Sequence, residues 1–366
     1  MDQRAHDREV FANLMTDILN KGALNLAMAI GYRAGLFEFM DELDAPAASH
    51  EIAEESRLDQ RYIEEWLGVM VTGKVILVSR SDEGEPRYQL PKAHGDLLTR
   101  RSGSGNLGVY TQEIPLLNQE AYAGVLRGLR TGEGIGYDSY LEFQTFMSEL
   151  ADAKHREVLV ETFLPSVAGG EILARLQQGM AVCDLGCGGG VAVLLMARAF
   201  PDSRFVGLDL SREAIERARA EATREGILNA EFRCVDAAVL SSSQEFREAF
   251  DYISAFDAIH DQTRPMAALN GVFHMLKPGG YFSMVDIAAS SDLRENLEHP
   301  LGPFLYTVSL MHCMPVGRVD GGAGLGMMWG REKATQMLSD AGFSDIQVTP
   351  VPEDPFNDHF LCRKRN

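Results

Sequence analysis

The sequence lacks the features of several protein classes. Five of its 366 residues are cysteines, and no two of them form a C-x-x-C pair, which argues against a zinc ribbon and a disulfide scaffold. No apolar run approaches the roughly 18 residues that a membrane-spanning helix needs. The first residues, MDQRAHDREVFANLMTD, are charged from the start and show no secretory signal. We therefore expect reduced thiols, a cytoplasmic location and no membrane partner.

Positive charge is scarce relative to negative charge. The chain has 34 Lys and Arg against 53 Asp and Glu, a net charge of -19. Binding to a phosphate backbone relies on clustered Lys and Arg that release counterions. We therefore expect no nucleic-acid partner, whereas a cationic small molecule remains compatible with this charge.

The first part of the chain has the pattern of helices followed by a hairpin. Residues 21–43 carry apolar side chains at helical spacing, and further helices are expected at 48–56 and 59–76. Two strand-like runs around a DEGEP turn follow within residues 75–90. Helix, turn, helix and β-wing together describe a mainly α winged-helix domain, which we place at residues 1–105.

The third of these helices is the one that would read DNA in such a module. It offers Arg61 and Lys74 against Asp59, Glu64 and Glu65, so it is net acidic. A recognition helix needs donors for phosphates and base edges. The charge favours an interaction role, and we expect a homodimer that forms through this domain.

Residues 106–165 are predicted to be a helical linker. Within it, the glycine-rich stretch TGEGIGYDSY runs into an aromatic-dense helix. One interpretation is a core stripe after a glycine turn. The other is the wall of a ligand pocket, with Tyr137 and Tyr140 binding a substrate.

Short apolar strands then alternate with longer helical stretches, which is typical of a parallel α/β sheet, and we place this domain at residues 166–366. The strands are expected at residues 180–185, 203–210, 230–236, 250–256, 280–287, 345–351 and 359–365. The helices between them are expected at 191–200, 212–225, 265–276 and 331–341.

A glycine loop follows the first of these strands. Gly186, Gly188 and Gly190 permit positive φ and close approach of a ligand, and the next helix offers free N–H groups. Asp184 ends the first strand, and Asp209 ends the second, where an acid can accept both ribose hydroxyls. A dinucleotide and S-adenosylmethionine each carry a ribose that Asp209 could bind. The carboxylate of Asp184 would repel a pyrophosphate and would suit the cationic amino-acid portion of S-adenosylmethionine.

Four motifs, DLGCGGG, LDLS, VDA and LKPGG, occur in an order and spacing that resembles class I S-adenosylmethionine-dependent methyltransferases, over about residues 170–365. The resemblance implies a seven-stranded, doubly wound, Rossmann-like sheet whose last strand is antiparallel. It implies S-adenosyl-L-methionine as cofactor. Besides the three glycines and two acids above, we expect cofactor contacts from Leu210, Asp236, Ala237 and Phe256.

The stretch DAIHDQTRP follows the fourth strand. Together with the winged helix it resembles the small-molecule O-methyltransferases of the plant caffeate and bacterial polyketide type, and the resemblance implies His260 as general base and Asp286 as the acid that orients it. An imidazole beyond the carboxyl end of a parallel strand also suits proton removal at neutral pH. Asp261 is expected to cap the next helix or to fix the loop. A further acid of that family corresponds to Met328 here.

Residues 293–330 interrupt the α/β alternation and are predicted to form a lid. His312 either lines the substrate site or belongs to a core stripe of the lid. Met328 and Trp329 are expected to line a methionine-rich rim of the pocket. His299 and His312 find no third ligand at sensible spacing, so no metal is expected.

The predicted function is therefore methyl transfer from S-adenosylmethionine to a small-molecule acceptor, with a hydroxyl favoured. S- or N-methylation of a small metabolite is the first alternative, because a thiol or amine needs less help from a base. A winged-helix regulator that senses S-adenosylmethionine is the second.

Overall fold

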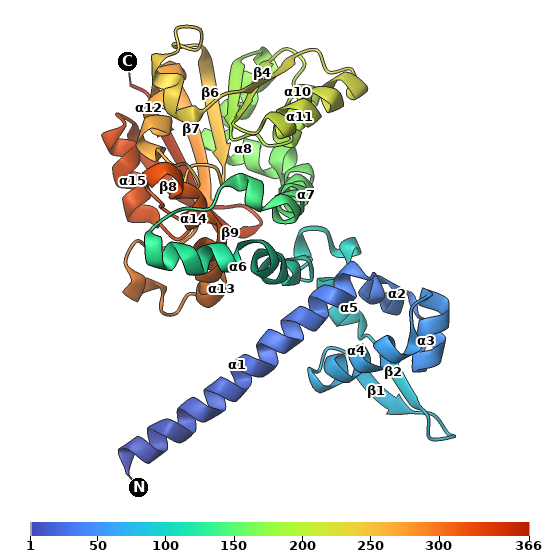
Figure 1. The fold of residues 1–366 in the computed structure, drawn as a ribbon. Helices are drawn as coiled ribbons and strands as arrows, with labels where there is room; N and C mark the ends of the chain where they lie inside the picture. The colour runs from blue at the N-terminus through green and yellow to red at the C-terminus, as the bar shows by residue number, and fades with distance from the viewer. Residues whose placement is uncertain (1, 366) are drawn as a thin grey trace. The chain divides into compact units, whose positions relative to one another are not determined.

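The structure, a computed structural model, describes residues 2–365. The chain divides between Leu116 and Leu117 into two compact units (Figure 1).

The N-terminal unit is helical with one two-stranded hairpin. Its antiparallel strands pair Leu77 with Gln89 and Arg80 with Pro86, as the wing predicted from the sequence requires. Its elements are α1 (Gln3–Arg33), α2 (Leu36–Glu42), α3 (Ser49–Ser56), α4 (Gln60–Thr72), β1 (Leu77–Arg80), β2 (Pro86–Gln89), α5 (Lys92–Leu98) and the 3-10 turns η1 (Arg100–Gly105) and η2 (Val109–Gln112). The core of this unit includes Phe37 and Leu67, which are fully buried.

Helix α1 is longer than the apolar stripe that predicted it. It begins after Asp2, whose side chain accepts a hydrogen bond from the Arg4 N–H, and it ends before Gly35, which adopts a φ of +73°. Its first five turns expose a set of large apolar side chains, which recur at intervals of three and four residues and so share one face. We call this set the α1 stripe: Val10, Phe11, Leu14, Met15 and Ile18.

Helices precede the sheet of the larger unit. They are α6 (Glu113–Thr131), η3 (Tyr137–Ser139), α7 (Leu141–Val158), the π-helix η4 (Leu159–Phe163), α8 (Leu164–Ser166), η5 (Val167–Gly170) and α9 (Glu171–Gln178).

The seven predicted strands are confirmed as one sheet with the order β5-β4-β3-β6-β7-β9-β8. Strands β3 to β7 are parallel to one another, and β9 is antiparallel to both β7 and β8. The strands are β3 (Ala181–Leu185), β4 (Arg204–Asp209), β5 (Ala230–Cys234), β6 (Phe250–Phe256), β7 (Leu276–Ile287), β8 (Ser344–Val351) and β9 (Asp354–Arg363).

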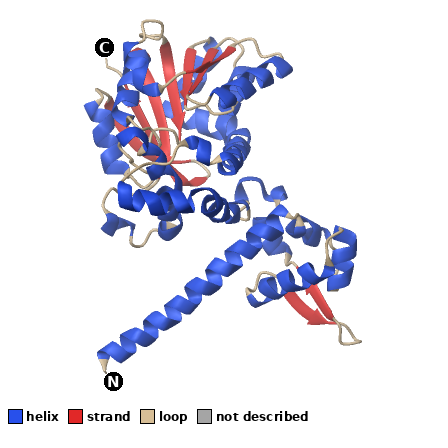
Figure 2. Ribbon diagram, in the orientation of Figure 1, coloured by secondary structure: helices blue, strands red, loops and turns tan. Residues whose placement is uncertain are grey.

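Both faces of this sheet are buried by helices (Figure 2). Successive residues along a strand enter opposite hydrophobic clusters: Val182 and Tyr252 on one face, Cys183 and Ile253 on the other. This explains why the inner strands β3, β6 and β7 are largely apolar runs, whereas the outer strands β5 and β8 carry exposed polar residues. The helices that connect them are α10 (Val191–Ala199), α11 (Arg212–Glu225), α12 (Pro265–Met275) and α15 (Arg331–Asp340), with the 3-10 turn η6 (Ala237–Ser242).

The segment between β7 and α15 is helical and irregular. It contains η7 (Leu293–Asn296), α13 (Gly302–Val308), the π-helix η8 (Ser309–Cys313), α14 (Met314–Gly317) and η9 (Val319–Gly321). Within residues 2–365, no helix is both long and apolar enough to cross a membrane.

Candidate active site

The glycine loop joins β3 to α10 at the carboxyl end of the sheet. Gly186, Gly188 and Gly190 have φ values of +76°, +51° and +79°, so all three need the left-handed region predicted for them. A Cβ on Gly186 would lie 2.4 Å from the Cβ of Ala258, whereas a Cβ on Gly188 or Gly189 would meet open space. The middle of the loop therefore offers bare backbone for a ligand to approach.

Two carboxylates, the buried Asp184 and the partly buried Asp209, flank this loop at the ends of neighbouring strands. Asp184 accepts a hydrogen bond from the Ser254 hydroxyl (2.7 Å), and burial raises the pKa of Asp184 to about 7. Asp209 accepts from the N–H of Gly188 (2.9 Å) and of Ser211 (2.7 Å), and burial again raises its pKa. Among the described residues, no cationic side chain contributes to either shift. A cationic ligand would supply the positive charge that neither carboxylate finds in its surroundings.

Asp236 and Ala237 follow β5 and open η6. One oxygen of Asp236 accepts from the Ala238 N–H (2.8 Å), and the other pairs with Arg264 (2.7 Å). Ala237 is buried, while Leu210, beyond the end of β4, is 63% exposed and free to pack on a ligand. These positions lie at the carboxyl ends of adjacent parallel strands, where ligands of open α/β sheets bind.

Phe256 ends β6, the next strand in the sheet. Its ring centroid lies 4.8 Å from that of His155 and 5.6 Å from that of Phe163, both in edge-on contacts. Burial lowers the pKa of His155 to about 4, so this imidazole is neutral near pH 7. The predicted role of Phe256 in cofactor binding remains a prediction.

The fit of these residues to S-adenosylmethionine rests on two features. Bare backbone at Gly188 and Gly189 leaves space for a ligand, and among the described residues neither the buried Asp184 nor the partly buried Asp209 has a cationic partner. S-adenosylmethionine carries a positive charge and a ribose, so it suits two carboxylates beside an open glycine loop.

His260 lies in the loop after β6 and pairs with an acid on β7. Its Nδ1 lies 2.8 Å from Oδ1 of Asp286, and the two residues are 3% and 0% exposed. An ionised carboxylate only accepts hydrogen bonds, so Nδ1 carries the proton and Nε2 carries the lone pair of the neutral ring. The predicted partners are thus brought together.

Opposing effects set the charge of His260. Burial lowers the pKa of this imidazole, but the nearby carboxylates of Asp286 and Asp261 outweigh it and raise the pKa well above the ordinary value of 6.5. The ring is therefore easily protonated while no other cation is nearby, and a cation bound beside it would oppose that proton.

Asp261 does not cap the following helix. Helix α12 begins at Pro265 with Arg264 as N-cap and without a side-chain cap, so the helix-cap alternative is wrong, and the alternative that Asp261 fixes the loop stays a prediction. The chain needs three more residues to turn into the helix, which leaves Asp261 beside the imidazole. Its Oδ1 lies 3.4 Å from Nε2 of His260, and its Oδ2 accepts a hydrogen bond from the Tyr137 hydroxyl (3.0 Å).

An aromatic cluster surrounds His312 of the π-helix η8. The ring centroid of His312 lies 4.7 Å from that of Tyr140, 4.8 Å from that of Phe143 and 5.9 Å from that of Tyr137. Burial lowers the pKa of His312, so the ring is neutral, and its Nε2 has no hydrogen-bond partner among the described residues. The Tyr140 hydroxyl donates to the Met311 carbonyl (2.8 Å). The structure thus groups three predicted substrate residues.

The other two predicted substrate residues pack elsewhere. Met328 belongs to a small apolar cluster with Ile287, Ala289 and Leu305. Trp329 belongs to the core on one face of the sheet, and among the described residues its Nε1 lacks a partner. Their substrate role remains a prediction.

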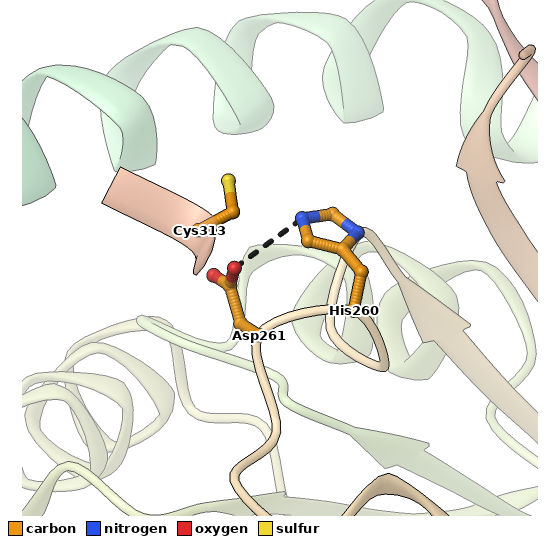
Figure 3. A group of neighbouring side chains, drawn as sticks. All are labelled: His260, Asp261 and Cys313. Atoms are coloured by element: carbon orange, nitrogen blue, oxygen red, sulfur yellow. Dashed lines mark ion pairs between the residues drawn. The ribbon is translucent and has the colours of Figure 1, made fainter. Parts of the chain in front are cut away.

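Two neighbours of the site were not selected from the sequence. Phe143 lies in the first turn of α7, three residues after Tyr140, and the two ring centroids are 6.4 Å apart. Cys313 lies 3.6 Å from Nδ1 of His312 and beside His260 and Asp261 (Figure 3). Cys313 belongs to the π-helix η8, and no pattern in the sequence predicts a π-helix.

Two family models match the chain. Residues 176–342 match a methyltransferase domain, and residues 22–100 match an Rv2258c-like winged HTH domain.

The individual proteins that resemble this chain have low sequence identity to it. The ubiquinone biosynthesis O-methyltransferase of Shewanella pealeana is 27% identical over 142 residues, or 39% of this chain and 56% of that protein, so the match spans about half of the relative. The structure of human N-acetylserotonin methyltransferase in complex with SAM has a TM-score of 0.66 at 20% identity, covering 100% and 99% of the two chains. A putative O-methyltransferase from Nostoc punctiforme gives 0.69 at 15% identity, covering 96% and 98%. At these identities, the solved structures show a shared fold.

The charge balance at His260 is open to a direct test. In the free protein, an NMR titration of the histidine ring protons should place the pKa of His260 above 6.5. Asp286→Asn should lower this pKa, because the variant removes the carboxylate that stabilises the imidazolium. An unchanged pKa in Asp286→Asn would contradict the assignment of Asp286 as the partner of His260.

Proposed function

The chain carries an S-adenosylmethionine-dependent methyltransferase domain behind an N-terminal winged HTH domain, and from this premise we propose that it methylates a hydroxyl of a small molecule with His260 as general base. The observation that carries the proposal is the buried His260–Asp286 pair, 2.8 Å apart, at the carboxyl edge of the sheet that also holds the glycine loop.

The cofactor is assigned to the ends of β3, β4 and β5. Bare backbone at Gly188 admits the ligand, Asp184 faces its cationic amino-acid portion, and Asp209 accepts the ribose hydroxyls. Asp236, Ala237 and Leu210 are assigned to the adenine. When bound, S-adenosylmethionine supplies an electrophilic methyl group on a sulfonium, which leaves as a thioether.

His260 removes the proton of the acceptor hydroxyl. Nδ1–H donates to Asp286, so Nε2 is the atom that takes the proton as the oxygen bonds to the methyl carbon. The imidazolium that results is stabilised by the Asp286 carboxylate. Because both groups are buried, water competes little for either, and the pair holds the ring in one orientation.

The acceptor is assigned to the aromatic cluster around His312. Tyr137 is partly exposed, and the buried rings of Tyr140 and Phe143 pack behind it around His312, a lining that would suit a flat apolar molecule. Residues 106–165 would then supply one wall of the substrate site, and residues 293–330 would cover it. The cytoplasmic location remains part of this proposal.

The alternatives differ in what they ask of His260. S- or N-methylation is favoured by one observation, the apolar packing of Met328 where the resembled family has an acid. A thiol or amine acceptor would need the base less. A regulator that senses S-adenosylmethionine would transfer no methyl group at all.

The transfer is tested with methyl-labelled S-adenosylmethionine and a metabolite extract, followed by mass spectrometry. We expect label in a small molecule and a loss of roughly 10²- to 10⁴-fold in rate for His260→Ala, the usual contribution of a general base. His50→Ala, which removes a half-exposed histidine of the winged unit, is the matched control and should transfer normally. Full transfer by His260→Ala would favour a thiol or amine acceptor, and binding without transfer would favour the regulator.

We also assign the winged-helix domain, residues 1–105, to homodimer formation. The α1 stripe supports this, because a monomer would leave these large apolar side chains in water. The acidic surface of α4 supports protein contact over DNA.

Sedimentation equilibrium tests the dimer. Leu14→Glu with Ile18→Glu should shift the protein toward monomer, since both changes place charge within the α1 stripe. Asn13→Glu with Asn20→Glu adds the same charge to the opposite face of the same helix and should leave the dimer intact. A dimer that resists the first pair, or a wild-type monomer, would refute the assignment.

A further inference from the structure

Three different donor atoms meet at the catalytic histidine. The available ligand atoms of His260, Asp261 and Cys313 all lie within 4.8 Å of one another, and Nε2 of His260 is 3.4 Å from Oδ1 of Asp261 (Figure 3). Two of these residues come from the loop after β6, and the third from the π-helix η8. Side chains from two separate elements therefore form one cluster.

The donor set is the one that zinc prefers. Zn²⁺ takes imidazole nitrogen, thiolate sulfur and carboxylate oxygen, with bond lengths of about 2.0 to 2.3 Å, in a tetrahedron whose fourth position can hold water. Such bonds place neighbouring ligand atoms roughly 3.3 to 3.7 Å apart. The His260–Asp261 separation already has this value, and the sulfur of Cys313 lies within 4.8 Å of both atoms.

The surroundings of the cluster are those of a metal ligand. A metal-bound histidine almost always donates its other ring N–H to a carboxylate or carbonyl, and Asp286 receives that bond from Nδ1 of His260 (2.8 Å). This fixes the tautomer that leaves Nε2 free to coordinate. Among the described residues, Oδ1 of Asp261 is buried and has no hydrogen-bond partner, so it is an acceptor without a donor.

The charge of the cluster also favours a dication. Burial raises the pKa of the Cys313 thiol to about 12, so the thiol is neutral while no cation is present. A bound Zn²⁺ would displace that proton, and the thiolate and the Asp261 carboxylate would then offset the two charges of the cation. Charges that are paired in this way cost less in a buried site than isolated ones.

A second group, Asp257, His260 and Asp286, offers only nitrogen and oxygen and uses the Nδ1 side that already binds Asp286. His299 and His312, the pair considered from the sequence, belong to neither group. The sulfur-containing cluster is therefore the stronger candidate.

We propose that His260, Asp261 and Cys313 form an exchangeable binding site for a thiophilic divalent cation, Zn²⁺ in particular, which inhibits the enzyme. Coordination uses Nε2 of His260, so a bound cation takes the lone pair that would accept the acceptor proton. Binding rests on the geometry and donor chemistry of the three side chains, whereas inhibition rests on the proposed function.

Binding is tested without turnover by adding Co²⁺ to the full chain and recording the near-ultraviolet band of a cobalt thiolate. We expect the band in wild type, its removal by Zn²⁺, and its loss in Cys313→Ser. Asp261→Asn should weaken Co²⁺ binding by about tenfold or more. Circular dichroism verifies that each variant is folded.

Cys234→Ser is the matched control, because Cys234 is the exposed cysteine while the other four are buried. It should retain the band. Absence of the band in wild type, its survival in folded Cys313→Ser, or its loss in Cys234→Ser would overturn the site. If both thiol variants misfold, an unchanged Co²⁺ affinity in folded Asp261→Asn would do so.

The activity arm keeps the two proposals apart. Zn²⁺ should inhibit methyl transfer by wild type and Cys234→Ser, and half-inhibition of Cys313→Ser should need about tenfold more Zn²⁺. A cobalt band without methyl transfer would leave the cation site and remove the proposed function. Methyl transfer that is unaffected by Zn²⁺, with no cobalt band, would leave the proposed function and remove the cation site.

Discussion

One buried hydrogen bond, from Nδ1 of His260 to Asp286, controls the chemistry available at this site. Both groups are almost completely buried, which favours a neutral ring, yet the Asp286 carboxylate favours a charged one and prevails. The same bond fixes the ring tautomer and aims Nε2 at Asp261 and Cys313. Proton removal, the proposed competition by Zn²⁺ and the orientation of the ring therefore all depend on it.

The sheet places this bond beside the glycine loop. Strands β4, β3, β6 and β7 are consecutive neighbours and parallel, so Asp209, Asp184, His260 and Asp286 all lie at or beyond their carboxyl ends. A cationic ligand at the two aspartates and a base at the histidine can then serve one reaction. The cation would also lower the proton affinity of His260, which favours the neutral base.

The sequence predicts most of the fold because its strongest signals are local. The inner strands β3, β6 and β7 are largely apolar and buried, and the three glycines mark positive φ at a strand–helix turn, so both signals can be recognised without tertiary knowledge. The His260–Asp286 pairing came from a family resemblance, since 26 residues separate the partners and no local pattern joins them.

What the sequence does not predict depends on long-range packing. Asp261 reaches Tyr137 across 124 residues, and a helix cap was the more local expectation. Cys313 reaches the site through a π-helix, whose extra residue per turn alters which side chains share a face. Met328 and Trp329 look like a rim in sequence but pack into apolar clusters, because burial of large side chains serves a core equally well.

The most direct test of the His260–Asp286 account is the pH dependence of kcat/KM, measured with the acceptor on wild type and Asp286→Asn. Only the neutral imidazole accepts a proton, so kcat/KM should rise with pH through the pKa of His260. In Asp286→Asn that rise should move to lower pH, because the lost carboxylate no longer favours the imidazolium, and the plateau should fall. A flat profile in wild type, or a rise that Asp286→Asn leaves in place, would contradict the role of this pair.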